Sequence, residues 1–450
     1  MKKLILTLSL CALACSNSLS ATTLVAPDKA EQMLQKQAQH FKQRIVQVSP
    51  NVYTAVGYHG ATTSMIVGDD GVIIIDTLMG PSSAKNALTD FRKYSKKPVK
   101  AIIYTHSHGD HVGGTSAFTQ GQNVTIIGPS GMNNHHGTDT TLDNIMKKRE
   151  MRQFGRTLPT HEQSNRGVAQ AKTIDHDRGK GFIPPNIRVD DRYKTQISGV
   201  DIEIYRAAGE TNDTMFIWLP KEQVLFSGDN FYQAFPNLYA IRGTPYRDVR
   251  VWAKSVTKMA AFEPTAIVGG HTSPIIGKKQ ATAALKDYSE AIQSVFEQTI
   301  AGMNNGLDPI SIGQSIKLPS HLHDKPYLTE FYGTASHASR AIYSGMLGWF
   351  DGNPKNLNPL SNLELAKKMA VLAGGSQQLL NQLQLAVSTQ EFQWALELAS
   401  HLSYLPEIDS QQVILAQISS LRALAAREYN APNRNYYFSY ANELEQILIK

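Results

Sequence analysis

The stretch His106-Ser107-His108-Gly109-Asp110-His111 places three histidines and one aspartate within six residues. It follows the apolar run Lys100–Thr105 and precedes Gly113-Gly114, so it lies on a strand-to-helix turn. Alternate residues of an extended chain point the same way, which pairs His106 with His108. Asp110 and His111 lie past the turn and face a second point. This arrangement predicts two adjacent metal ions, about 3.5–4 Å apart.

No cysteine thiolate is expected among the ligands of those ions. The two cysteines, Cys11 and Cys15, both lie in the first 20 residues, which are expected to be removed. Imidazole and carboxylate ligands without thiolate suit zinc, with manganese and iron as alternatives.

The residues around this stretch alternate between short apolar runs and helical patterns. The apolar runs are Gly71–Asp76, Lys100–Thr105, Val124–Ile127, Met215–Leu219 and Val224–Ser227. The key runs end in clusters of polar residues. A helix is predicted at Pro81–Tyr94, and another at Thr141–Phe154. The segment that contains the second helix is compatible equally with a pocket-covering insertion and with an ordinary surface excursion. The pattern indicates an α/β domain with its chemistry at strand ends and loops.

Strand patterns cease after about Gly277. Lys278–Met303 is one long helical pattern, and residues 361–430 form several helices. Breaks between them fall at Gly374-Gly375, Ser388-Thr389 and Leu405-Pro406. The pattern resembles a tetratricopeptide-like hairpin array and predicts a packing or dimerisation module.

Length and charge narrow the class of protein further. A chain of 450 residues is too long for one ordinary domain, so two are expected. The net charge of +6 includes Lys2 and Lys3 and is too small and dispersed to indicate nucleic-acid binding. A mean hydropathy of −0.27 excludes a multi-span membrane protein.

The N-terminus has the order of a signal peptide. Met1-Lys2-Lys3 is basic, Leu4–Ala14 is apolar but too short to span a bilayer, and Ser18–Ala21 offers small residues for cleavage. Residues 1–20 are therefore predicted to be removed on export to the periplasm, with no stable membrane insertion. A lipoprotein anchor at Cys15 is less favoured, because the residues before it fit that signal poorly.

The histidine stretch resembles the metal-binding motif of the metallo-β-lactamase superfamily, and residues downstream agree in order. Glu210 lies in a Gly-Glu-Thr loop, Asp229 follows an apolar run, and His271 follows Gly269-Gly270. The resemblance implies an α/β fold, an αββα sandwich followed by an all-helical dimerisation domain. It also implies one Zn²⁺ held by His106, His108 and Glu210, a second held by Asp110, His111 and His271, and a bridging Asp229.

A glutamate in place of the superfamily's usual third histidine is similar to the alkylsulfatase-like group. The segments Tyr332–His337, Gly348–Pro354 and Asn237–Gly243 also resemble that group. The resemblance implies a catalytic domain over residues 21–302 and a dimerisation domain over 303–450, hence a homodimer. Two departures stand out: Asp229 replaces the group's bridging glutamate, and the chain stops before a sterol-carrier-like domain.

The group's activity implies an exported di-zinc hydrolase of sulfate esters, using a metal-bound hydroxide on a small-molecule substrate. Asp110, Arg242 and His337 are the implied catalytic residues, and Arg242 and Tyr332 are the implied substrate contacts. A guanidinium can hold two sulfate oxygens in a planar fork. The alternative is β-lactam hydrolysis on the same two metal ions. A third possibility, a metal-binding assembly protein without turnover, conflicts with seven intact candidate ligands.

Overall fold

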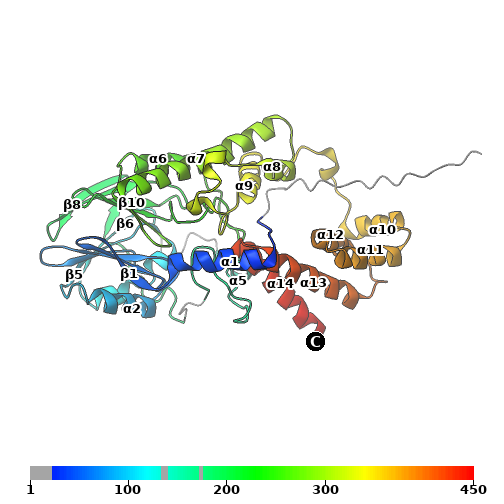
Figure 1. Cartoon of the computed structure of the whole chain (residues 1–450), viewed down its shortest axis with the longest axis horizontal. Coiled ribbons are helices and arrows are strands. Elements are labelled where there is room, and N and C mark those ends of the chain that lie inside the picture. The colour runs from blue at the N-terminus through cyan, green and yellow to red at the C-terminus, as the bar shows by residue number, and fades with distance from the viewer. Residues whose placement is uncertain (1–22, 133–139, 172–175, 450) are drawn as a thin grey trace, which may run out of the picture.

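The computed structural model describes residues 23–132, 140–171 and 176–449 (Figure 1). The predicted signal peptide, residues 1–20, lies outside these ranges. Within them, the first sheet has seven strands in chain order. These strands are β1 (Arg44–Ser49), β2 (Val52–Val56), β3 (Thr63–Val67), β4 (Val72–Ile75), β5 (Val99–Ile103), β6 (Thr125–Pro129) and β7 (Ile187–Val189). The pairings from β1 to β4 are antiparallel, and those from β4 to β7 are parallel.

The second sheet has six described strands in the order β13-β12-β11-β10-β9-β8. Its strands are β8 (Arg192–Ile197), β9 (Val200–Arg206), β10 (Met215–Leu219), β11 (Val224–Gly228), β12 (Ala266–Gly269) and β13 (Ile275–Ile276). Only the β11–β12 pairing among them is parallel. Strands β4, β10, β11 and β12 are buried along their whole length, which explains their continuous apolar sequences.

The two sheets pack face to face and helices cover their outer faces. Apolar side chains such as Ile73, Ile103 and Phe226 fill the layer between the sheets. Helices α2 (Pro81–Phe91) and α4 (Thr115–Thr119) pack on the first sheet, and α6 (Val249–Ala260) and α7 (Lys278–Asn304) on the second. The predicted αββα sandwich is therefore confirmed.

Several predicted elements match the observed bounds closely. The predicted strand Met215–Leu219 is β10, and the long helical pattern from Lys278 is α7. The helix predicted at Thr141–Phe154 is α5 (Asp143–Gln153), preceded by a short 3₁₀ turn. Because α7 continues to Asn304, the predicted boundary at residue 302 falls inside its last turn, and the domain division stays a prediction.

Beyond Ile276 the described part of the chain forms helices and no strand. After α8 (Pro309–Ser315) and α9 (Ala335–Leu347) come α10 (Asn362–Leu372), α11 (Ser376–Ser388), α12 (Phe392–Leu402), α13 (Ser410–Arg427) and α14 (Ala431–Ile449). The helix breaks fall where the glycine, serine-threonine and proline signals predict them. No described helix is both long enough and apolar enough to cross a membrane.

The helical array divides into two parts. Helices α10–α12 share their own apolar core at the end of the molecule away from the sheets (Figure 1). Helices α13 and α14 instead return toward the sandwich, where α13 contacts α1 (Pro27–Ala38) and α14 contacts α5. A backbone bridge between Leu24 and Glu428 joins the N-terminal segment to the end of α13.

Candidate metal centre

The candidate ligands lie where strands of both sheets end. His106 and His108 follow β5, and Asp110 and His111 lie in the short helix α3 (Gly109–Val112). Asp229 follows β11, and His271 follows β12. Because these strand ends meet at one edge of the sandwich, ligands distant in sequence converge there.

The Gly113-Gly114 pair allows α3 to approach the chain after β4. A Cβ atom at Gly113 would overlap the carbonyl oxygen of Met79, and one at Gly114 would overlap that of Thr77. The pair therefore serves backbone packing behind the histidines, where only glycine fits.

His106, His108 and Asp229 form one potential ion-binding group. The Asp229 Oδ2 atom lies 3.6 Å from His106 Nε2 and 3.8 Å from His108 Nδ1. A tetrahedral ion with bonds of about 2.0–2.1 Å holds its ligand atoms about 3.3 Å apart. The observed separations exceed ordinary hydrogen bonds and suit atoms that share an ion.

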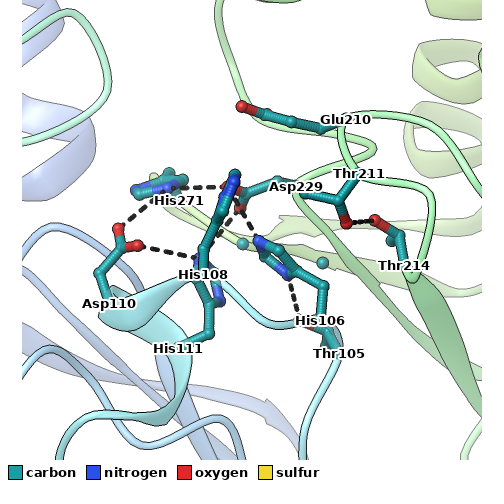
Figure 2. Close-up of polar contacts among 12 residues, drawn as sticks. Thr105, His106, His108, Asp110, His111, Glu210, Thr211, Thr214, Asp229 and His271 are labelled. Atoms are coloured by element: carbon teal, nitrogen blue, oxygen red, sulfur yellow. Dashed lines mark hydrogen bonds and ion pairs between the residues drawn. The ribbon is translucent and has the colours of Figure 1, made fainter. Parts of the chain in front are cut away.

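Asp110, His111 and His271 form the second group. Asp110 lies 3.6 Å from His271 Nε2 and 4.0 Å from His111 Nε2. Asp229 reaches this group as well, with Oδ1 3.3 Å from His111 Nε2 and Oδ2 3.3 Å from His271 Nε2 (Figure 2). Its carboxylate therefore stands between the two groups, where the sequence predicts a bridging ligand.

Hydrogen bonds on the far side of the rings leave the inward nitrogens free. His271 Nδ1 lies 2.7 Å from the carbonyl oxygen of Gly60, and His111 Nδ1 lies 2.7 Å from Asp76 Oδ2. Among the described residues, His106 Nε2, His111 Nε2 and Asp229 Oδ1 are buried without a hydrogen-bond partner. Oriented imidazoles with unpaired inward nitrogens fit a divalent cation such as zinc.

Charges within the cluster also favour a bound cation. Burial opposes ionisation of Asp229, but His271 and His111 hold the pKa of its carboxyl well below the usual range. Burial alone would lower the pKa of His271, but Asp229 raises it to about 9. Cation binding would therefore displace a proton from this imidazole and make affinity increase with pH.

Asp76 is a supporting residue that the sequence reasoning missed. Its carboxylate accepts hydrogen bonds from Thr105 N and Thr105 Oγ1, both at 2.8 Å, and from His111 Nδ1. Thr105 Oγ1 in turn lies 3.0 Å from His106 Nδ1, so one carboxylate orients a ligand of each group. Its backbone has φ of 55°, an uncommon value for a residue with a side chain. The sequence did contain a signal for this role, because Asp76 is a carboxylate that directly follows the buried apolar run of β4.

Glu210, the predicted third ligand, lies outside both groups (Figure 2). Its Oε1 atom is 3.0 Å from Arg247 Nη1, with 5% and 3% of the two side chains exposed. Burial raises the pKa of the Glu210 carboxyl, and Arg247 opposes that shift. Because Glu210 Oε2 is buried without a hydrogen-bond partner among the described residues, ligation by Glu210 stays a prediction.

Arg247 borders a cavity of about 530 Å³ beside the metal centre. The cavity combines apolar and cationic side chains, chiefly Arg149, Leu238, Tyr246, Arg247, His337 and Arg340. Sequence reasoning missed Arg149 and Arg247 because it had no distances with which to rank the arginines. Burial, with a smaller contribution from Arg340, lowers the pKa of His337 to about 4, so this imidazole is neutral at pH 7.

The two other predicted contacts lie near the cavity without lining it. Arg242 donates its backbone N–H to Gln153 Oε1, and its Nη1 lies 3.2 Å from the carbonyl oxygen of Gly243. The Tyr332 ring stacks edge-on at 5.7 Å from Tyr232, between centroids, and burial raises the pKa of Tyr332. The roles of Arg242 and Tyr332 stay predictions.

Residues 57–271, which contain strands of both sheets and all the candidate ligands, match the metallo-beta-lactamase superfamily. Residues 308–447 match the family described as alkyl sulfatase dimerisation. The chain belongs to the alkylsulfatase family of that superfamily.

Individual relatives agree over most of the chain. A linear primary-alkylsulfatase of Pseudomonas sp. (strain ATCC 19151) is 33% identical, covering 85% of this chain and 73% of the relative. An (R)-specific secondary-alkylsulfatase of Pseudomonas sp. is 30% identical, covering 89% and 62%. The solved structure of a stereoselective inverting sec-alkylsulfatase of Pseudomonas sp. is 28% identical with a TM-score of 0.83, covering 92% and 67%. The chain thus spans roughly two thirds of the length of these relatives.

Proposed function

We propose that this protein is a zinc-dependent hydrolase of sulfate esters. The observation that supports this most directly is the buried Arg247, which contacts Glu210 beside the metal ligands and lines the adjoining cavity. The alkylsulfatase relatives supply the reaction class. Two zinc ions per chain are proposed, because there are two ligand groups and Asp229 of the first lies 3.3 Å from both His111 and His271 of the second.

The cavity suits an anionic group. Among the described residues that line it are Arg149, Arg247 and Arg340, and none of the lining residues is a carboxylate. Glu210 offsets one of these charges by pairing with Arg247. The remaining positive charge attracts a sulfate, whose oxygens match the planar fork of a guanidinium.

Each part of the site then has a chemical task. Bound divalent ions supply Lewis acidity and lower the pKa of water. Arg247 holds sulfate oxygens and offsets the charge that develops as the ester bond breaks. His337 offers a neutral imidazole at the cavity wall, because a pKa of about 4 leaves it unprotonated at pH 7. Asp110 would hold the second ion together with His271 and His111.

The decisive experiment compares two substrates in one zinc-loaded preparation. The ratio kcat/KM is measured for a medium-chain alkyl sulfate and for a chromogenic cephalosporin. A large preference for the sulfate ester supports the proposal. A large preference for the cephalosporin would replace it with β-lactam hydrolysis, and turnover of neither would favour a non-enzymatic metal protein.

We further propose export to the periplasm and assembly as a homodimer through the helical array. Export is supported by the order of charge, apolar run and small residues in residues 1–20. Assembly is supported by the match of residues 308–447 to a dimerisation family. Cell fractionation with N-terminal sequencing tests the first, and light scattering of the purified protein tests the second.

A further inference from the structure

Helix α5 lies between the candidate substrate cavity and the C-terminal helix α14. Gln153 is its one buried residue among those described, so apolar packing on the sheets does not hold it in place. Its position depends on polar contacts made by two different faces of the helix.

One face of α5 holds the backbone next to the cavity. Arg149 Nη2 donates to the carbonyl oxygen of Ile241 at 2.6 Å, and Gln153 Oε1 accepts from Arg242 N at 2.8 Å. Arg149 and Gln153 lie one helical turn apart, so together they bind both polar groups of one peptide unit, the amide that joins Ile241 to Arg242. The segment that they hold, residues 237–247, ends in Arg247 and is closed by a hydrogen bond from Arg247 to the Asn237 carbonyl oxygen.

The other face of α5 binds α14. The Arg152 guanidinium makes two parallel hydrogen bonds to the Glu443 carboxylate, at 2.8 and 2.6 Å. The same guanidinium lies over the rings of Tyr440 and Tyr436, 4.8 and 5.4 Å from their centroids. A bidentate pair that also stacks on aromatic rings has a defined geometry, unlike a single exposed ion pair.

A third contact reaches the buried end of α5. Asn435 of α14 donates to the carbonyl oxygen of Gln153 at 3.3 Å and to that of Asn165 at 3.2 Å. Gln153 therefore receives a hydrogen bond from α14 at its backbone and accepts one from Arg242 at its side chain. A single residue connects the helical array to the cavity wall.

We infer that α14 positions the cationic wall of the cavity through α5, with Arg152 and Gln153 as positioning residues for Arg149 and Arg247. The helical array then belongs to the substrate site as well as to assembly. This inference rests on the proposed function in one respect: the ligand used to test it is an anion, sulfate or an alkyl sulfate.

The test compares two glutamates on the same helix. Glu443 pairs with Arg152 of α5, whereas Glu445 pairs with Arg422 of α13 at 2.8 Å. The two side chains are 42% and 39% exposed, so Glu445→Gln is a matched control for Glu443→Gln. We expect Glu443→Gln to raise KM for an alkyl sulfate about threefold with kcat and metal content unchanged. Glu445→Gln should leave KM unchanged.

Gln153 provides a second, buried pair of variants. Gln153→Met removes the acceptor for Arg242 N and should raise KM about fivefold, as expected for one lost hydrogen bond. Gln153→Glu retains an acceptor oxygen and should restore KM toward the wild-type value. Equal effects of Met and Glu would indicate only a packing role and would overturn the inference.

A binding measurement separates this inference from the proposed function. The Kd for inorganic sulfate, measured by calorimetry on each zinc-loaded variant, should increase by the same factors as KM. If the wild type binds sulfate but hydrolyses no sulfate ester, the proposed function fails while the inference is still tested. If Glu443→Gln and Glu445→Gln bind sulfate equally well, or if wild type binds none, the inference is wrong.

Discussion

Asp76→Asn should weaken metal binding although Asp76 belongs to neither ligand group. The substitution retains the shape of the side chain but replaces one carboxylate oxygen with an NH₂ group. The carboxylate accepts from both Thr105 and His111, and an amide oxygen can replace only part of this set. An NH₂ group facing His111 Nδ1 would favour the tautomer with its proton on Nε2. That proton occupies the nitrogen aimed at the cation.

The expected loss follows from the contacts that change. Removing the orienting partner of a ligand histidine lowers metal affinity by about 10- to 100-fold. At about 1.4 kcal/mol per factor of ten, this corresponds to about 1.4–2.8 kcal/mol. The loss should fall mainly on the group that contains His111, because His106 is reached only through Thr105.

The assay is a competition titration of zinc against a chromophoric chelator, together with elemental analysis after dialysis. Asp90→Asn is the matched control, since the Asp90 carboxylate contacts Tyr58 and Lys93 and none of the ligands. We expect one weakened site in Asp76→Asn and wild-type affinities in Asp90→Asn. Wild-type affinity in both variants would refute the orienting role of Asp76.

Three other perturbations have defined outcomes. Arg247→Met should lower kcat/KM for an alkyl sulfate at least about 100-fold, because it removes the guanidinium proposed to hold the sulfate oxygens and leaves the buried Glu210 unpaired. Arg250→Met, which breaks an exposed pair with Asp248, should have little effect. Burial raises the pKa of the Glu330 carboxyl to about 7, above its value in the unfolded chain. The favourable contribution of Glu330 to folding is therefore fully present below about pH 4.5 and is lost as the pH rises through 7. Glu330→Gln should therefore gain up to about 3 kcal/mol in unfolding free energy over wild type between pH 4.5 and 8.5, measured by urea titration; a pH-independent difference would contradict this. Chelator dialysis should lower Tm and abolish turnover, and added zinc should restore both; an unchanged Tm would argue against ligand-stabilised folding.

The spacing of local patterns predicted much of the architecture. The apolar run Met215–Leu219 is a strand with those bounds, and the three helix breaks predicted within residues 361–430 fall where expected. Six of the seven candidate ligands lie in the two groups, because His106–His111 is one short turn and Asp229 and His271 directly follow buried strands. The element bounds and the histidine stretch depend on neighbours in the chain, whereas Asp229 and His271 were assigned from the family resemblance.

Other features depended on how distant segments pack. Arg242 and Arg247 share one short segment, yet only Arg247 contacts Glu210 and lines the cavity. The choice between them depends on side-chain directions in a loop held by α5, which no periodic pattern encodes.

The amino-acid sequence by itself determined the α/β pattern, the helical array and the metal-binding stretch, because backbone periodicity and short turns are local properties. The sandwich was predicted from the resemblance to the metallo-β-lactamase superfamily. Only the tertiary structure decided which arginine side chains border the cavity. It also decided the contact between α5 and α14 through Arg152 and Glu443, which lie 291 residues apart in the sequence. The physical reason is that a hydrogen bond requires an exact distance, and distances between remote segments exist only once the sheets and helices have packed.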